Sequence, residues 1–149
     1  MEPPLIRPLL ILLSILLSPV VIAAEPVDPV KAWRGQPVYL DFWASWCTPC
    51  AESFPWLNRL QAQYGTKLRV VGVNVDARRG DAERFLRRHP AEFALFYDPE
   101  GDLAARYELK GMPSAVLLDS EGRVLWQHSG FRTNEVPDYE AAIRSALKR

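Results

Sequence analysis

The feature that most constrains the fold is an apolar strand that runs directly into two cysteines and a helix. Residues 38–43 read Val-Tyr-Leu-Asp-Phe-Trp, a nearly continuous apolar run typical of a strand covered on both faces. The helix predicted over residues 50–64 has apolar side chains at helical spacing, namely Phe54, Leu57, Leu60 and Tyr64. A buried strand followed at once by such a helix indicates an α/β domain.

The remaining pattern extends this unit into a complete domain. Further strands are predicted at residues 68–75, 93–97, 114–119 and 124–128, and further helices at 81–89, 103–107 and 136–147. The last two strands flank the turn Ser120-Glu121-Gly122, which favours an antiparallel hairpin. Strands that alternate with helices and end in a hairpin and a helix predict a central mixed β-sheet flanked by helices.

The beginning of the chain differs in kind. Residues 8–22 are almost wholly apolar, and Ala23 and Ala24 lead from them into a polar, Pro-rich run. This order is typical of a secretory signal peptide over residues 1–24, and an N-terminal membrane anchor is the alternative. Residues 25–149 then form one domain. Either interpretation places that domain in the periplasm or another extracytoplasmic space, where disulfides persist.

Composition limits what the domain binds and how its cysteines act. The 18 Lys and Arg balance the 18 Asp and Glu, so net charge favours neither nucleic acid nor an anionic membrane as partner. We separately expect the protein to be a monomer. The two cysteines, Cys47 and Cys50, would close a loop too small to stabilise the fold much. Their role is therefore chemical. A zinc site would need further ligands, and a copper site would need Cys, His or Met near the pair.

The position of the pair at the start of a helix favours thiol chemistry. Free N–H groups and the positive end of the helix dipole stabilise a thiolate at Cys47, which lowers its pKa and makes it the attacking species. Cys50 lies one turn later and can close a disulfide with it. Pro49 suits the first helical turn, where its missing N–H costs little.

Asp41 interrupts a strand that otherwise reads as buried. A carboxylate in such a place is costly unless it is neutral or has a partner, so burial should raise its pKa. Groups of this kind are candidate acid–base residues. We expect Asp41 to lie beneath Cys50 and to take the proton of that thiol.

Together these motifs resemble thioredoxin-like proteins, and in particular the exported TlpA/ResA-type branch. The run Asp-Phe-Trp-Ala-Ser-Trp-Cys-Thr-Pro-Cys at residues 41–50 is similar to the thioredoxin active-site segment, and Pro55 matches the proline that kinks its helix. A helical insert at 78–93, before Gly-Met-Pro at 111–113, also resembles that branch. The resemblance runs from Val38 to the C-terminus and implies a thioredoxin-like fold with this insert preceding a cis-proline.

The resemblance also implies roles for individual residues. Cys47 would attack, Cys50 would resolve the mixed disulfide, and Asp41 would match the buried acid of thioredoxins. Pro113 would be cis and face the disulfide. Substrate contacts are expected at the residues around these groups: Trp46, Thr48, Pro49, Met112 and Pro113. The Cys47–Cys50 disulfide would be the redox centre, and neither a separate cofactor nor a metal is expected.

The chain departs from the branch in two places. Its members often carry Glu six positions after the first cysteine, where this chain has Ser53, while Glu52 lies on another helix face. Acid–base work is therefore expected of Asp41 alone. The lead-in before Val38 is also short, so the N-terminal hairpin common in that branch should be abbreviated.

The expected function is that of an extracytoplasmic thiol–disulfide oxidoreductase, and more specifically a protein-disulfide reductase. Its partners would be cysteine-containing client proteins, with a membrane thiol-transfer protein as electron donor. Apocytochrome c, a copper-site protein and a general set of misoxidised proteins are all open as clients. The alternative is a copper-binding metallochaperone that uses the two thiolates.

Overall fold

The computed structural model describes residues 28–149, and the residues predicted as a signal peptide or anchor lie outside this range. Within it, no helix is both long enough and apolar enough to cross a membrane. The elements follow in the order α1 (Pro29–Ala32), β1 (Val38–Trp43), α2 (Thr48–Tyr64), η1 (Gly65–Lys67), β2 (Arg69–Asn74), α3 (Arg79–Arg88), β3 (Ala94–Tyr97), α4 (Asp102–Arg106), β4 (Ser114–Leu118), β5 (Val124–Ser129), η2 (Thr133–Glu135) and α5 (Val136–Ala146).

The predicted strands and helices are present, and their ends shift by up to two residues. Helix α2 begins at Thr48 because Cys47 acts as its N-cap and Pro49 fits its first turn. Helix α3 begins at Arg79, before the predicted residue 81. Strand β3 begins at Ala94, and Phe93 instead packs in the core. In the described part of the chain, only the short helix α1 precedes β1, and no hairpin does.

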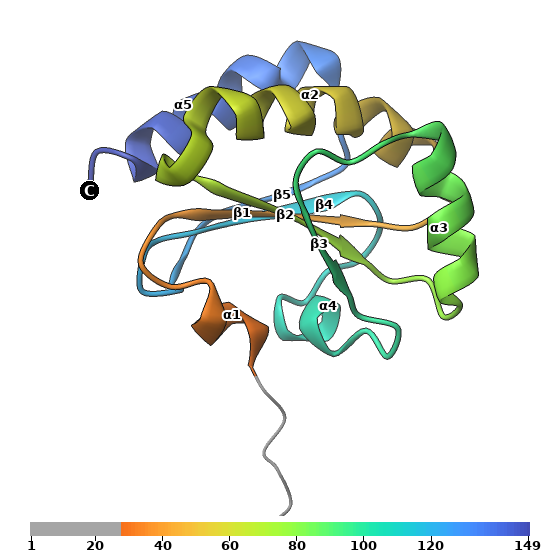
Figure 1. Ribbon diagram of the computed structural model, residues 1–149. Coiled ribbons are helices and arrows are strands. Elements are labelled where there is room, and N and C mark those ends of the chain that lie inside the picture. Colours follow the sequence, from red (N-terminus) through yellow and green to blue (C-terminus); the bar gives the residue numbers. More distant parts are fainter. Residues whose placement is uncertain (1–27) are drawn as a thin grey trace, which may run out of the picture.

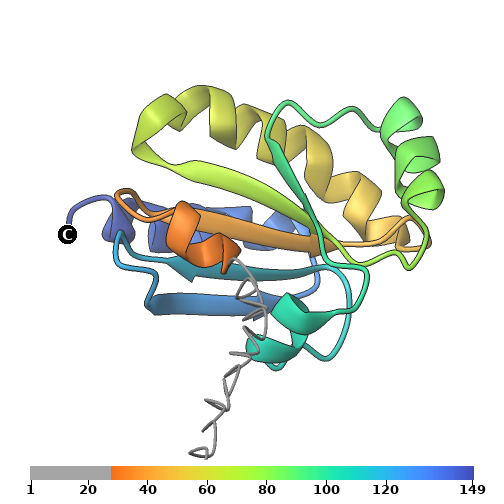
Figure 2. The ribbon, with the colours of Figure 1, turned by 60° about the horizontal axis from the view of Figure 1, so that its bottom comes forward.

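The sheet is mixed and has the strand order β3-β2-β1-β4-β5 (Figure 1). Strand β1 pairs in parallel with β2 and antiparallel with β4, so it is the central strand. Strands β2 and β3 are parallel, and the hairpin β4–β5 is antiparallel as predicted. Helices α2 and α5 cover one face, while α1 and α4 cover the other, which is turned toward the viewer in Figure 2.

The alternation of β1 side chains divides the core into two clusters. Leu40 and Phe42 pack on the α1 and α4 side. Tyr39 and Trp43 face α2 and α5, in the cluster that also contains both cysteines. Since side chains two apart on a strand share a face, Asp41 points toward this second cluster. The fold thus places the acid and the cysteines on the same side of the sheet.

Candidate active site

The two cysteines lie where β1 ends and α2 begins, and they form a disulfide. Both are buried, whereas the adjacent Trp46 is 69% exposed. The backbone N–H of Cys50 donates to Cys47 Sγ at 3.2 Å. After reduction, the same N–H and the positive end of α2 would stabilise a thiolate on Cys47. The structure thus places Cys47 at the start of the helix as expected, and the stabilisation of its thiolate stays a prediction.

Asp41 is 3% exposed, and its Oδ2 atom has no hydrogen-bond partner among the described residues. Burial raises the pKa of this carboxyl to about 8, because the surroundings disfavour its charged form, and the hydroxyl of Ser53 offsets this only in part. The predicted upward shift is confirmed. A carboxyl with this pKa is mostly protonated at neutral pH, and its deprotonated fraction is a base whose strength suits proton transfer near that pH.

Ser53 connects the acid to the first turn of α2. It is fully buried, and its Oγ donates to the carbonyl oxygen of Cys50 at 3.0 Å. Its influence on the pKa of Asp41 shows that it also lies close to that carboxyl. Glu52 is exposed, in agreement with its predicted place on another helix face. Asp41 is therefore the buried carboxyl on this side of the cysteines.

The peptide bond between Met112 and Pro113 is cis, as the resemblance implied. Phe42 pairs with Ser114 across β1 and β4, so Pro113 lies beside the end of β1 that leads to Cys47. Two hydrogen bonds hold this loop: Ser114 Oγ donates to the Gly111 carbonyl at 2.7 Å, and Gly130 N–H donates to the Pro113 carbonyl at 2.8 Å. The topology thus brings residues more than sixty positions apart to one edge of the sheet.

The remaining predicted site residues surround the disulfide. Thr48 and Pro49 are exposed in the first turn of α2, next to the exposed indole of Trp46. Met112 is half-buried beside the buried Pro113. The contribution of these side chains to substrate binding stays a prediction.

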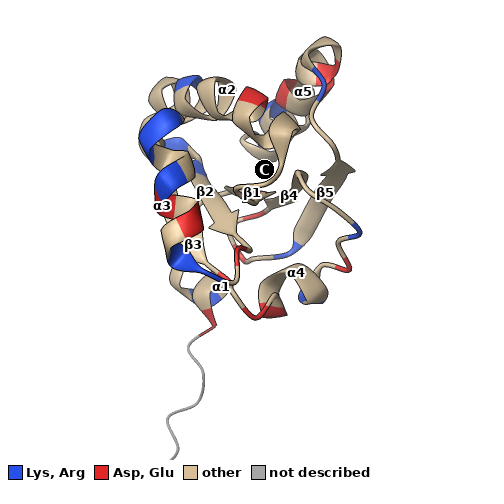
Figure 3. Cartoon of the chain, turned by 90° about the vertical axis from the view of Figure 1, so that its right-hand side faces the viewer, with Lys and Arg blue, Asp and Glu red and all other residues tan. Residues whose placement is uncertain are grey.

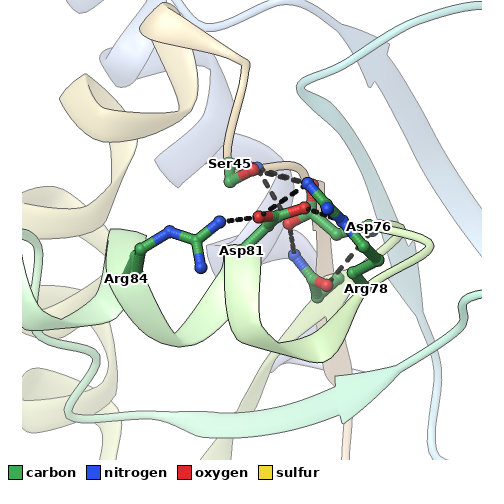
Figure 4. Close-up of polar contacts among 6 residues, drawn as sticks. Ser45, Asp76, Arg78, Asp81 and Arg84 are labelled. Atoms are coloured by element: carbon green, nitrogen blue, oxygen red, sulfur yellow. Dashed lines mark hydrogen bonds and ion pairs between the residues drawn. The ribbon is translucent and has the colours of Figure 1, made fainter.

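Sequence reasoning missed a buried carboxylate that fixes the loop before Cys47. Asp76 is 6% exposed and accepts hydrogen bonds from Ser45 N–H at 2.9 Å and from Ser45 Oγ at 2.8 Å. Asn74 Nδ2 donates to the same carboxylate at 2.8 Å, and Figure 4 shows Asp76 beside Ser45. The sequence feature that could have revealed this contact is an Asp and an Asn at the end of a buried strand parallel to β1. The carboxyl ends of neighbouring parallel strands lie at the same edge of the sheet.

A mixed sheet whose central strand leads into a helix-capping Cys-x-x-Cys beside a cis-proline defines a thioredoxin-like redox protein. A solved structure assigned as thiol:disulfide interchange protein DsbE from Chlorobium tepidum agrees, with 49% identity, a TM-score of 0.76, and coverage of 79% of this chain and 84% of that one. The chain belongs to the Redoxin family, whose model matches residues 24–143. The predicted resemblance to ResA/TlpA-type proteins is thereby confirmed.

Three further relatives support this assignment. StoA from Bacillus subtilis is 25% identical, with a TM-score of 0.63 and coverage of 72% of this chain and 84% of that one. Thiol-disulfide oxidoreductase ResA from Geobacillus kaustophilus is 30% identical over 114 residues, which are 76% of this chain and 64% of the relative. The ResA of Bacillus thuringiensis subsp. konkukian is 27% identical, and the match covers 71% of this chain and 62% of the relative. The chain thus spans less than two thirds of these curated relatives.

Residues 28–149 contain no group of three or more His, Cys, Asp or Glu side chains arranged to hold a metal ion. The names of the ResA and DsbE relatives describe thiol–disulfide chemistry, and neither supports the copper-binding alternative.

Proposed function

We propose that this protein is an extracytoplasmic protein-disulfide reductase that acts through a mixed disulfide on Cys47. The observation that carries the proposal is the burial of Cys50, Ser53 and Asp41 on one side of the central strand, with Ser53 hydrogen-bonded to the Cys50 carbonyl and next to the Asp41 carboxyl. It supplies a resolving thiol together with a base whose pKa suits neutral conditions. The names of the relatives, thiol-disulfide oxidoreductase and thiol:disulfide interchange protein, support the same reaction class.

The reaction follows from this geometry in two exchanges. The Cys47 thiolate attacks one sulfur of a client disulfide, which forms a mixed disulfide and releases the client's other sulfur as a thiolate. Ionised Asp41 then accepts the proton of Cys50, whose sulfur attacks Cys47 Sγ and expels the second client sulfur as a thiolate, which takes up a proton from Asp41 or from solvent. Two electrons pass to the client, and the Cys47–Cys50 disulfide observed here is the product. A dithiol donor must reduce it again, and a membrane thiol-transfer protein is our proposed source.

The direction of electron flow rests on how strongly the site stabilises the thiolate. Cys47 Sγ accepts a hydrogen bond from one backbone N–H, and no Lys, Arg or His among the described residues donates to it. A strong oxidant stabilises its reduced form, as the potential of about −120 mV for DsbA illustrates. A modestly stabilised thiolate favours a value closer to that of thioredoxin, about −270 mV.

The decisive experiment is to trap clients with the Cys50→Ser variant in an extracytoplasmic extract. We expect mixed disulfides that a thiol reductant releases, and none from the matched variant that carries both Cys47→Ser and Cys50→Ser. The reduction potential of the unaltered protein, measured against glutathione, should lie nearer to the thioredoxin value. A lack of trapped species, or a potential near that of DsbA, would contradict the proposal.

A further inference from the structure

Helix α3 carries a basic surface that the proposed reaction does not use. We call it the α3 arginine surface, and its members are exposed side chains of one type: Arg78, Arg79, Arg84, Arg87 and Arg88. Only Asp81 and Glu83 oppose them within residues 78–88, although the whole chain has equal numbers of basic and acidic residues. Figure 3 shows the positions of basic residues, in blue, along α3.

The ion pairs within the helix leave its last turn without a counter-charge. Asp81 pairs with Arg78 and Arg84 (Figure 4), and Glu83 pairs with Arg79 at 3.3 Å. Arg87 and Arg88 have no carboxylate within ion-pair distance among residues 28–149. The paired arginine side chains are 59–80% exposed, so each pair contributes little to stability.

The α3 arginine surface lies beside the disulfide. On its inner face, Phe85 packs against Trp43 and Phe54, with ring centroids 4.9 Å and 5.2 Å apart. Trp43 is the last residue of β1, and Phe54 lies one helical turn after Cys50. Asp76, two residues before Arg78, holds the Ser45 backbone next to the exposed Trp46. A protein that reaches Cys47 from the α3 side must therefore pass these arginines.

We propose that the α3 arginine surface docks an acidic segment of the protein that exchanges disulfides with Cys47, an inference that rests on the proposed function. Guanidinium groups pair with carboxylates through two parallel hydrogen bonds, a geometry that lysines lack. A lipid surface fits less well, because membrane-binding helices bury an apolar face in the bilayer. The apolar residues of α3 already serve the core: Ala82 and Phe85 are buried in it, and the partly buried Leu86 packs against it.

The test compares disulfide peptides of one central sequence flanked by Glu, Gln or Lys, with reduction followed as kcat/KM. At low ionic strength we expect kcat/KM for the Glu peptide to be at least about tenfold higher than kcat/KM for the Gln peptide. The advantage should shrink at physiological salt, where the Debye length is about 8 Å. The double variant Arg87→Glu with Arg88→Glu should abolish it. The matched control is Lys148→Glu with Arg149→Glu, which follows α5 at the far end of the molecule (Figure 1) and should keep it.

A cysteine-free Glu peptide separates docking from catalysis, because its binding is measured by fluorescence anisotropy without any exchange. If the unaltered protein binds the Glu peptide and the α3 double variant does not, the docking proposal is supported. If no disulfide peptide is reduced in the same experiments, only the proposed function fails. Equal rates for the three disulfide peptides, equal losses in both double variants, or no binding of the Glu peptide would overturn the proposal. It is also overturned if vesicles of equal parts phosphatidylcholine and phosphatidylglycerol bind through Arg87 and Arg88 while the Glu peptide does not.

Discussion

Replacing Asp41 with Asn should change the stability of the oxidised protein with a sign that depends on pH. The carboxyl titrates near 3.8 in an unfolded chain and at about 8 in the folded protein. Below about pH 4 both states hold the proton, so the charge costs nothing. Between these values the folded state binds more protons than the unfolded one, and stability falls as pH rises. Above the folded pKa the full cost is present.

The magnitude follows from the same two values. Each pH unit between them is worth about 1.4 kcal/mol, so the wild-type protein loses on the order of 4 kcal/mol of unfolding free energy by pH 7. Asn removes this loss, but its amide needs a partner in a buried site, and an unsatisfied one costs about 1–3 kcal/mol. We therefore expect Asp41→Asn to be destabilised near pH 4 and stabilised by about 1–3 kcal/mol near pH 7.

Urea unfolding of the oxidised protein from about pH 4 to pH 9 measures this directly. The matched control is Asp119→Asn at the opposite end of the sheet. Burial there raises the pKa of Asp119, but hydrogen bonds from Arg123 and the Glu121 N–H outweigh it, so the pKa is lowered. That control should lose stability at neutral pH, and the loss should shrink as pH falls through the folded pKa. A difference between Asp41→Asn and wild type that does not vary with pH would refute the reasoning, and unchanged resolution of mixed disulfides would remove Asp41 from the mechanism.

Two further pairs of substitutions, each a test and its control, examine how the site and the core around it are held. Asp76→Ala leaves a buried donor on Asn74 and part-buried donors on Ser45 unsatisfied and should cost about 2–4 kcal/mol in chemical denaturation, whereas Ser45→Ala removes a single side-chain bond and should cost about 1 kcal/mol; equal costs would show that the carboxylate does not hold the loop. Gly72→Ala would bring a methyl group within 2.7 Å of Phe93 and should cost about 1–3 kcal/mol by the same assay. Gly80→Ala on the exposed part of α3 meets nothing closer than 3.7 Å and should be neutral or stabilising, so similar losses for both would reject the packing explanation.

The sequence predicted the local parts of this architecture because their causes are local. The apolar run of β1 specifies a central strand, and the cysteines at its end specify a helix start. The burial of Asp41 follows from the same run. The start of α3 was placed late because Arg78, its N-cap, makes no capping side-chain bond, and Asp81 instead pairs with arginines within the helix.

The missing parts depend on contacts between distant segments. Asp76 reaches Ser45 because β1 and β2 are parallel with Trp43 opposite Asn74, a register that apolar patterning does not specify. Spacing likewise gave Pro113 no special role, since its position depends on the pairing of Phe42 with Ser114. The resemblance to a family supplied what the pattern could not.

The burial of both cysteines in the larger core cluster ties the chemistry of the pair to the folding equilibrium. Folding and reduction form a closed thermodynamic cycle, so the difference in unfolding free energy between the dithiol and disulfide forms must equal the shift of the reduction potential from that of the unfolded chain. About 1.4 kcal/mol of this difference corresponds to about 30 mV. Any core substitution that stabilises the dithiol or the disulfide form more than the other therefore shifts the reduction potential of the protein, even when the substituted residue lies far from the two sulfur atoms.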